Sequence, residues 1–151
     1  MSDVSVAALE SALTRLIRRA LLPTSGDETR AAAGVTLERA AYHVLLRICD
    51  QGAVRLSAVA DSMGLDVSTV SRHVSRLEHD GLVTRSPDPD DGRAALLAAT
   101  DAGREVLERV RDARRARLQD ILGDWDERDV ERLAGLLDRL LATFDADRNR
   151  P

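Results

Sequence analysis

Apolar residues recur every three or four positions along most of the chain, a spacing typical of amphipathic helices. The helices expected on this ground are 4–22, 37–50 with Thr36 as N-cap, a short one capped by Ser57, one capped by Asp66, 101–122, and a last one capped by Asp126. Between the first two, residues 23–34 are polar and rich in turn formers, so we expect a loop there.

The helical spacing stops after Gly81 and returns at Asp101. Two β-prone runs, 82–85 and 94–100, enclose a stretch dense in Pro, Asp and Gly, residues 86–93. This pattern predicts a β-hairpin with a long tip and a weakly packed return strand. Helix, helix, tight turn at Gly64, helix and hairpin is the order of a winged helix-turn-helix. The predicted fold class is therefore mainly α with a small β-hairpin wing.

The helix that begins after Asp66 carries residues that helix stability does not explain. Val70, Val74 and Leu77 form its apolar stripe, but hydroxyls and basic side chains occupy the rest, and Ser and Thr are only middling helix formers. The outer residues are Ser68, Thr69, Arg72, His73 and Arg76, with His79 as a surface residue. In a helix-turn-helix the second helix lies in the DNA major groove with its N-terminal end towards the bases.

Each of these side chains has a role that suits docking on DNA. The hydroxyls of Ser68 and Thr69 are short enough to donate to phosphates, and the helix N-terminus itself favours an anion. Arg72, one turn further on, can make two parallel hydrogen bonds to a guanine edge, the commonest specific base contact. The sequence therefore predicts double-stranded DNA as the partner, with the 66–80 helix in the major groove.

The hairpin tip supplies a second basic contact. Arg93 ends the stretch 86–93, and a lone arginine on a wing suits a narrow, electronegative minor groove. Asp88, Asp90 and Asp91 lie close to it in sequence. We expect some of them to orient Arg93 or Arg85 through salt bridges; the alternative for Asp88 and Asp90 is a solvated acidic turn.

Composition and charge limit the class of protein. The 151 residues carry a net charge of −4 and a pI near 5.4, which argues against a bulk polyanion binder but allows a local basic surface. All 22 basic residues are Arg, which points to a GC-rich bacterial genome. No apolar run approaches the ~20 residues of a membrane span, and the first residues lack a signal-peptide pattern. These features predict a soluble cytoplasmic protein without membrane association.

Signatures of catalysis and metal binding are missing from the sequence. It has no Gly-rich phosphate loop, no His pair at metal-binding spacing and no Ser-His-Asp set at a supporting spacing. We therefore expect no enzyme activity, no cofactor and no metal. Cys49 is the one cysteine, so it forms no intramolecular disulfide; it is either a redox-sensing thiol or a structural one.

The chain resembles the MarR family of bacterial transcription regulators over nearly its whole length. The stretches that carry the resemblance are "LERAAYHVLLRI", "RLSAVADSMGLDVSTVSRHVSRLEHDGLVTRSPDPDDGR" and "TDAGREVL". Ser68, Thr69, Arg72 and Arg76 match the family's DNA-contacting positions, Arg93 matches its wing arginine, and Asp91 matches the acid that holds that arginine. Gly92 departs from the pattern, because many members carry a second basic residue there.

The resemblance implies a dimeric regulator, most often a repressor, that binds a pseudo-palindromic operator. It divides the chain into an N-terminal dimerisation helix and loop (1–35), a DNA-binding domain (36–100) and C-terminal dimerisation helices (101–151). Many members respond to small aromatic or anionic molecules, and the candidate pocket residues here are Arg15, Arg19, Tyr42, His43 and Arg47. The alternative for those five residues is ordinary helix surface, and the alternative for the protein is a winged-helix interaction module that has lost DNA binding.

Overall fold

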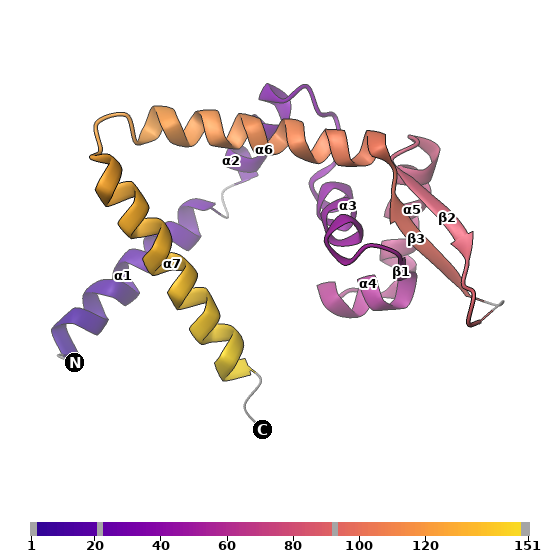
Figure 1. The fold of residues 1–151 in the computed structure, drawn as a ribbon, viewed down its shortest axis with the longest axis horizontal. Helices are drawn as coiled ribbons and strands as arrows, with labels where there is room; N and C mark the ends of the chain where they lie inside the picture. Colours follow the sequence, from indigo (N-terminus) through magenta and orange to yellow (C-terminus); the bar gives the residue numbers. More distant parts are fainter. Residues whose placement is uncertain (1–2, 21–22, 92–93, 149–151) are drawn as a thin grey trace. The chain divides into compact units, whose positions relative to one another are not determined.

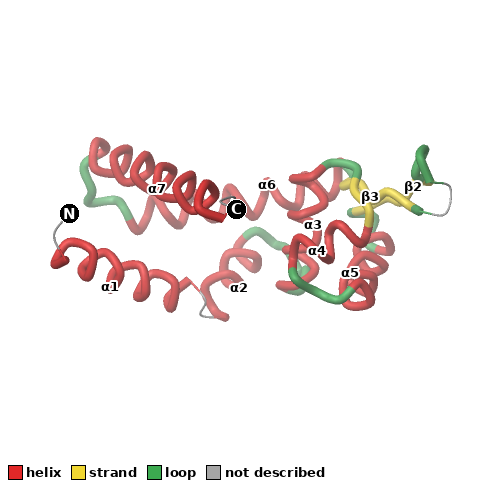
Figure 2. The backbone as a smooth tube through the Cα atoms, turned by 90° about the horizontal axis from the view of Figure 1, so that it is seen from below, coloured by secondary structure: helices red, strands yellow, loops and turns green. Residues whose placement is uncertain are grey.

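A computed structural model describes residues 3–20, 23–91 and 94–148 of the chain, which divides into two compact units, 1–114 and 115–151. Helix dominates, and the strands are confined to one small region (Figure 1, Figure 2). The elements are α1 (Asp3–Ala20), α2 (Pro23–Ala32), α3 (Arg39–Gln51), β1 (Val54–Arg55), α4 (Leu56–Met63), α5 (Val67–His79), β2 (Val83–Pro87), β3 (Ala95–Ala99), α6 (Asp101–Ile121) and α7 (Glu127–Arg148). The predicted fold class, mainly α with a small hairpin wing, is confirmed.

The core of the first unit lies between α3, α4, α5 and the sheet. Its fully buried side chains come from every one of these elements and are aliphatic: Val44, Leu45, Ile48, Val59, Ala60, Val70, Val74, Leu77 and Leu97. Val70, Val74 and Leu77 form the stripe that the sequence pattern predicted for α5. Cys49 is half-buried against this core. Burial of this stripe fixes which face of α5 remains on the surface.

The sheet has three antiparallel strands in the order β1-β3-β2. In the hairpin Val83 pairs with Ala99 and Pro87 with Ala95, and on the other side of β3 Val54 pairs with Leu97. The expectation of a weakly packed return strand was wrong. β3 is the central strand and buries Leu97 completely, because the two-residue strand β1, which the sequence did not reveal, pairs with its second edge.

Two further sequence expectations need correction near the N-terminus. Residues 23–34 are not a loop, since 23–32 form α2: a proline is well tolerated in the first turn of a helix, and the last turn contains alanines, the best helix formers. Thr36 does not cap α3, which begins at Arg39 with Glu38 at the N-cap position. The backbone N–H of Val35 donates to the Arg30 carbonyl at 2.8 Å, so the chain reverses at the end of α2 before α3 starts.

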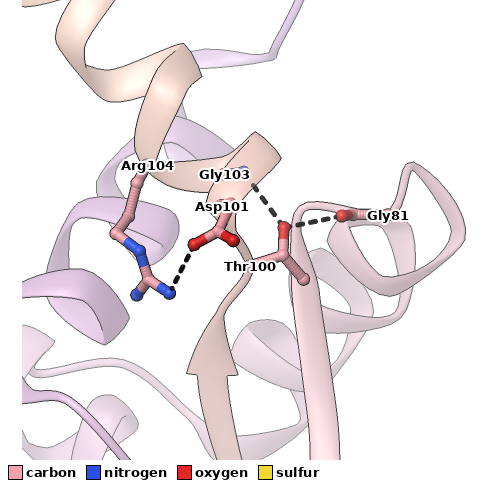
Figure 3. Close-up of polar contacts among 5 residues, drawn as sticks. All are labelled: Gly81, Thr100, Asp101, Gly103 and Arg104. Atoms are coloured by element: carbon pink, nitrogen blue, oxygen red, sulfur yellow. Dashed lines mark hydrogen bonds and ion pairs between the residues drawn. The ribbon is translucent and has the colours of Figure 1, made fainter.

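Thr100 joins the end of α5 to the start of α6 (Figure 3). Its hydroxyl donates to the Gly81 carbonyl oxygen at 2.8 Å and accepts the Gly103 backbone N–H at 3.0 Å. Gly103 packs so closely there that an added Cβ would lie 2.2 Å from the Leu82 carbonyl oxygen. The first turn of α6 is therefore fixed against the segment that follows the α5 helix.

The second unit contains the end of α6 and all of α7. The Asp126 carboxylate accepts the backbone N–H of Arg128 at 2.8 Å, which confirms it as the cap of α7. Among its described residues none is buried, although α7 carries a stripe of large apolar side chains. None of the helices in the described part of the chain combines the length and apolar character that a bilayer span requires.

Candidate nucleic-acid interface

The turn between α4 and α5 sets the direction in which α5 leaves the core. Gly64 adopts the left-handed conformation with φ +63°, which favours glycine, and its N–H bonds to the carbonyls of Ala60 and Asp61. Asp66 occupies the predicted N-cap position of α5, but its side chain makes no capping hydrogen bond to a described residue; its backbone carbonyl accepts the N–H of Thr69 at 3.0 Å. A glycine C-cap followed directly by an N-cap gives the short turn of a helix-turn-helix.

The predicted contact residues of α5 lie together on the side away from its buried stripe. Ser68, Arg72 and Arg76 are exposed, and Thr69 and His73 are partly exposed. Ser68, Arg72 and Arg76 are four residues apart, so their side chains follow one face of the helix. Hydroxyls at its N-terminal end and guanidinium groups further along form a surface that offers hydrogen-bond donors to a polyanion.

The two arginines of this face differ in their surroundings. Arg76 is 74% exposed and pairs with Asp80 at 3.4 Å, a long contact at the C-terminal end of the helix. Arg72 has no side-chain hydrogen bond or ion pair within the part of the chain that the structure describes. Its guanidinium therefore keeps all its donors for an external partner, whereas Arg76 must compete with one carboxylate.

A cleft of ≈ 750 Å³ runs beside this face, between α5 and the start of α3. Its walls come from both elements and carry the basic side chains of α5; the lining residues are Thr36, Leu37, Glu38, Ala41, Arg72, His73, Ser75, Arg76, His79 and Asp80. The exposed face of α5 is thus bordered by a concave surface on its α3 side.

Arg85 connects α5 with the strand that leads to the wing. Its guanidinium donates to both carboxylate oxygens of Glu78, at 3.1 and 3.0 Å. Of the two arginines that a wing aspartate was expected to orient, Arg93 or Arg85, Arg85 pairs with Glu78 instead, because β2 leaves the end of α5 with Arg85 facing the helix. The pair is bidentate, a geometry that defines the orientation of both partners.

Asp88 is neither a solvated turn residue nor a partner of Arg85. Its side chain is only 5% exposed and accepts Arg55 Nε at 2.6 Å. The backbone N–H of Asp90 and then the Arg55 guanidinium are the main causes that lower the pKa of Asp88. Asp91 is exposed, and its carbonyl accepts the Ala94 N–H at 2.8 Å. The predicted pairing of Asp91 with Arg93 lies outside the described residues, as does Arg93 itself.

The five candidate effector residues are not gathered in one cavity that the structure describes. Arg15 and Arg19 are exposed on α1, His43 and Arg47 are exposed on α3, and Tyr42 is buried in the core. None of them lines the cleft beside α5 or a second cleft, of ≈ 370 Å³, between the end of α2 and the start of α3.

A basic cluster lies beside Tyr42, and the sequence pattern does not predict it, because residues 23–34, which have the pattern of a loop, contain the helix α2. Arg30, in the last turn of α2, is 7% exposed, pairs with Asp27 and lies 5.8 Å from the centre of the Tyr42 ring. Tyr42 also makes an edge contact with His43 at 5.6 Å between ring centres. Partial desolvation of its ring lowers the pKa of His43, and the positive charges of Arg39, Arg30 and Arg114 lower it further. These surroundings disfavour the protonated form of His43.

The chain is similar to a known family, to several individual relatives and to solved structures. The sequence model of the MarR family matches residues 37–95. An uncharacterised HTH-type transcriptional regulator of Bacillus subtilis, YxaD, is 34% identical over 92% of this chain and 94% of its own length. The HTH-type transcriptional repressor IacR of Pseudomonas putida is 28% identical over 69% of this chain and 62% of its own.

Two solved structures of other proteins have a fold similar to that of this chain. The transcriptional regulator Tm0710 of Thermotoga maritima has a TM-score of 0.72 and 27% identity, over 93% of this chain and 99% of its own. A MarR family protein of Bacillus stearothermophilus has a TM-score of 0.76 over 99% of both chains, and at 21% identity it shows the fold alone.

Proposed function

Since the chain belongs to the MarR family and is a transcription regulator of the helix-turn-helix type, we propose that it represses transcription by binding a pseudo-palindromic operator as a homodimer. The relatives and the fold are those of regulators, not of enzymes. In this proposal α5 enters the major groove and the wing, residues 86–93, reaches the adjacent minor groove. The protein then acts where its DNA is, in the bacterial cytoplasm.

The observation that carries the DNA-binding proposal is the exposed face of α5. Ser68 and Thr69 offer hydroxyl donors at the helix N-terminus, and Arg72 offers a guanidinium that has no partner among the residues that the structure describes. Phosphate contacts from the first turn fix the position of a protein on the duplex, and a bidentate arginine then distinguishes guanine from the other bases. Sequence-specific recognition needs both kinds of contact, and this face supplies both.

The homodimer is supported by apolar side chains that the single chain leaves exposed. On α7, spacings of four and seven residues align Leu133, Leu137 and Phe144 on one face, and Phe144 is 54% exposed. Further large apolar residues are exposed on α1 and at the end of α6: Val6, Leu9, Leu16, Ile17, Leu118 and Ile121. Exposed apolar stripes of this kind mark interfaces, and a two-fold axis would cover the same stripes on both subunits.

A charge placed in this stripe tests the dimer. We expect wild type to sediment as a dimer and Leu137→Asp to weaken its association more than tenfold, because a carboxylate would be buried without a partner. Ala142→Asp, which adds the same charge to the opposite side of α7, is the matched control. Analytical ultracentrifugation of the three proteins measures this. Equal association of Leu137→Asp and Ala142→Asp would contradict the proposed interface.

Footprinting tests the operator. On DNA from upstream of its own coding region, we expect protection of two half-sites whose centres lie roughly 34 Å apart, one helical turn, because each subunit presents one α5. Protection of one half-site alone would contradict the dimeric arrangement. A uniform pattern, with no protected site, would contradict operator binding and favour the interaction module that has lost DNA binding.

An effector remains part of the proposal through the candidate residues Arg15, Arg19, Tyr42, His43 and Arg47. A small aromatic or anionic molecule releases the repressor only if it binds the DNA-free conformation more tightly than the DNA-bound one. Arg30 and Arg39 add positive charge close to His43 and so strengthen the case for an anion on this side of α3.

A further inference from the structure

A buried carboxylate organises the start of the wing tip. Asp88 follows β2, and its backbone N–H donates to the Ala94 carbonyl at 3.1 Å, the contact that closes the base of the tip. One oxygen of its side chain accepts the Asp90 backbone N–H at 2.9 Å, and the other accepts Arg55 Nε at 2.6 Å. The local bond to Asp90 shapes the turn. The bond to Arg55 does something different, because its partner lies outside the hairpin.

Arg55 stands at the junction of the sheet with the helix-turn-helix. It is the second residue of β1, and it occupies the N-cap position of α4, the helix that precedes the turn to α5. The expectation that Ser57 caps this helix was wrong, because α4 begins at Leu56. In the sheet it pairs with Leu96 of β3. An ion pair between Arg55 and Asp88 therefore connects the base of the wing with the two helices that present the recognition surface, across 33 residues of sequence.

Charge gives a second reason for this pair. The described part of the wing tip carries three carboxylates, on Asp88, Asp90 and Asp91, on a surface expected to approach phosphates. Asp90 and Asp91 also attract the Arg55 guanidinium, although Asp88 is its closest partner. Arg85, the arginine within β2, is occupied by Glu78. Among the described residues, Arg55 thus supplies positive charge that offsets the acidic tip.

We propose that the Arg55–Asp88 ion pair is a positioning device, which holds the wing at the orientation that lets it contact the minor groove while α5 occupies the major groove. Neither residue needs to touch a base. The side chain of Arg55 is 46% exposed and that of Asp88 is 5% exposed. Asp88 is therefore shielded from solvent within the wing, whereas solvent reaches the Arg55 side chain. The proposal rests on the proposed function, and in particular on a DNA contact by the wing through Arg93.

Two substitutions of opposite charge separate positioning from simple electrostatics. Arg55→Ala removes a positive charge and Asp88→Asn removes a negative one. Long-range attraction to DNA would make the first variant bind more weakly and the second more tightly. If the pair positions the wing, both variants bind the operator more weakly than wild type. We expect each to lose at least about fivefold in operator affinity, which is at the low end of the loss for removing one recognition contact. Arg104→Ala, which breaks a comparable exposed pair with Asp101 on α6, should leave affinity unchanged.

The experiment measures affinity by fluorescence anisotropy on the footprinted upstream duplex, with thermal melting to verify folding. It includes Arg93→Ala alone and combined with Arg55→Ala. If the pair acts through the wing, the double variant binds no more weakly than Arg93→Ala. Three results would each overturn the proposal. The first is a double variant whose loss of affinity equals the product of the two single losses. The others are a loss for Arg55→Ala with none for Asp88→Asn, and an Arg93→Ala protein that binds like wild type. Wild type without sequence preference would instead remove the proposed function itself.

Discussion

Gly103→Ala is expected to destabilise the fold by about 2–3 kcal/mol, the cost of forcing a methyl group into a packed site. The added Cβ would lie 2.2 Å from the Leu82 carbonyl oxygen and 3.2 Å from a Leu45 methyl group. The close neighbour is backbone, so no side-chain rotation relieves the clash. The strand-to-helix junction around Thr100, which fixes the first turn of α6, would have to move (Figure 3).

Gly135→Ala is the matched control for that experiment. Gly135 lies within α7, and an added Cβ would meet nothing within 4 Å. Replacement of a helical glycine by alanine in open space stabilises by roughly 0.5–1 kcal/mol. The urea concentration at the midpoint of unfolding, measured by circular dichroism, should therefore fall for Gly103→Ala and rise for Gly135→Ala. A Gly103→Ala protein as stable as wild type would show that the junction is loosely packed.

Arg72→Ala is expected to cost about 1–3 kcal/mol of operator affinity and to relax base preference at one position of each half-site. The reason is that Arg72 is exposed, one turn into α5, and its guanidinium makes no hydrogen bond or ion pair with any described residue. A base-reading arginine distinguishes guanine through two parallel hydrogen bonds, which alanine cannot replace. Affinities for a panel of duplexes with single base-pair changes measure both effects.

Arg76→Ala provides the comparison on the same helix face. Arg76 lies one turn further from the N-terminal end and shares its guanidinium with Asp80. As a phosphate contact it should weaken binding to every duplex alike and lower the salt dependence by about one unit. If Arg72→Ala gave that uniform pattern too, Arg72 would be a phosphate contact and the base reader would lie elsewhere.

The sequence was sufficient for the parts of the fold that depend on local periodicity. The stripe of Val70, Val74 and Leu77 placed α5 and its outer face, and Asp66 and Asp126 located two helix starts. Each of these features is encoded within a few residues. A helical face follows from spacing, and a cap follows from one side chain at the right position.

The parts that the sequence did not reveal depend on residues far apart in the chain. β1 is too short to give a strand pattern, and the Arg55–Asp88 pair forms only when the sheet brings its partners together. Arg85 pairs with Glu78 and not with Asp88, which is nearer to it in the sequence. The direction in which β2 leaves α5 decides this pairing, and residue spacing alone does not give that direction. The position of Arg30 beside Tyr42 could not be predicted for a different reason. The turn-forming residues in 23–34 are typical of a loop, although 23–32 form a helix.

The most direct test of the account is the affinity of wild-type protein for its own upstream DNA, compared with a scrambled duplex of equal length and composition. Anisotropy over a salt series separates the two contributions, because phosphate contacts give salt dependence on any duplex and base contacts give preference for one. We expect the upstream duplex to bind at least 10³-fold more tightly, as is typical of specific DNA-binding proteins. Equal affinity for the two duplexes at every salt concentration would contradict the central claim.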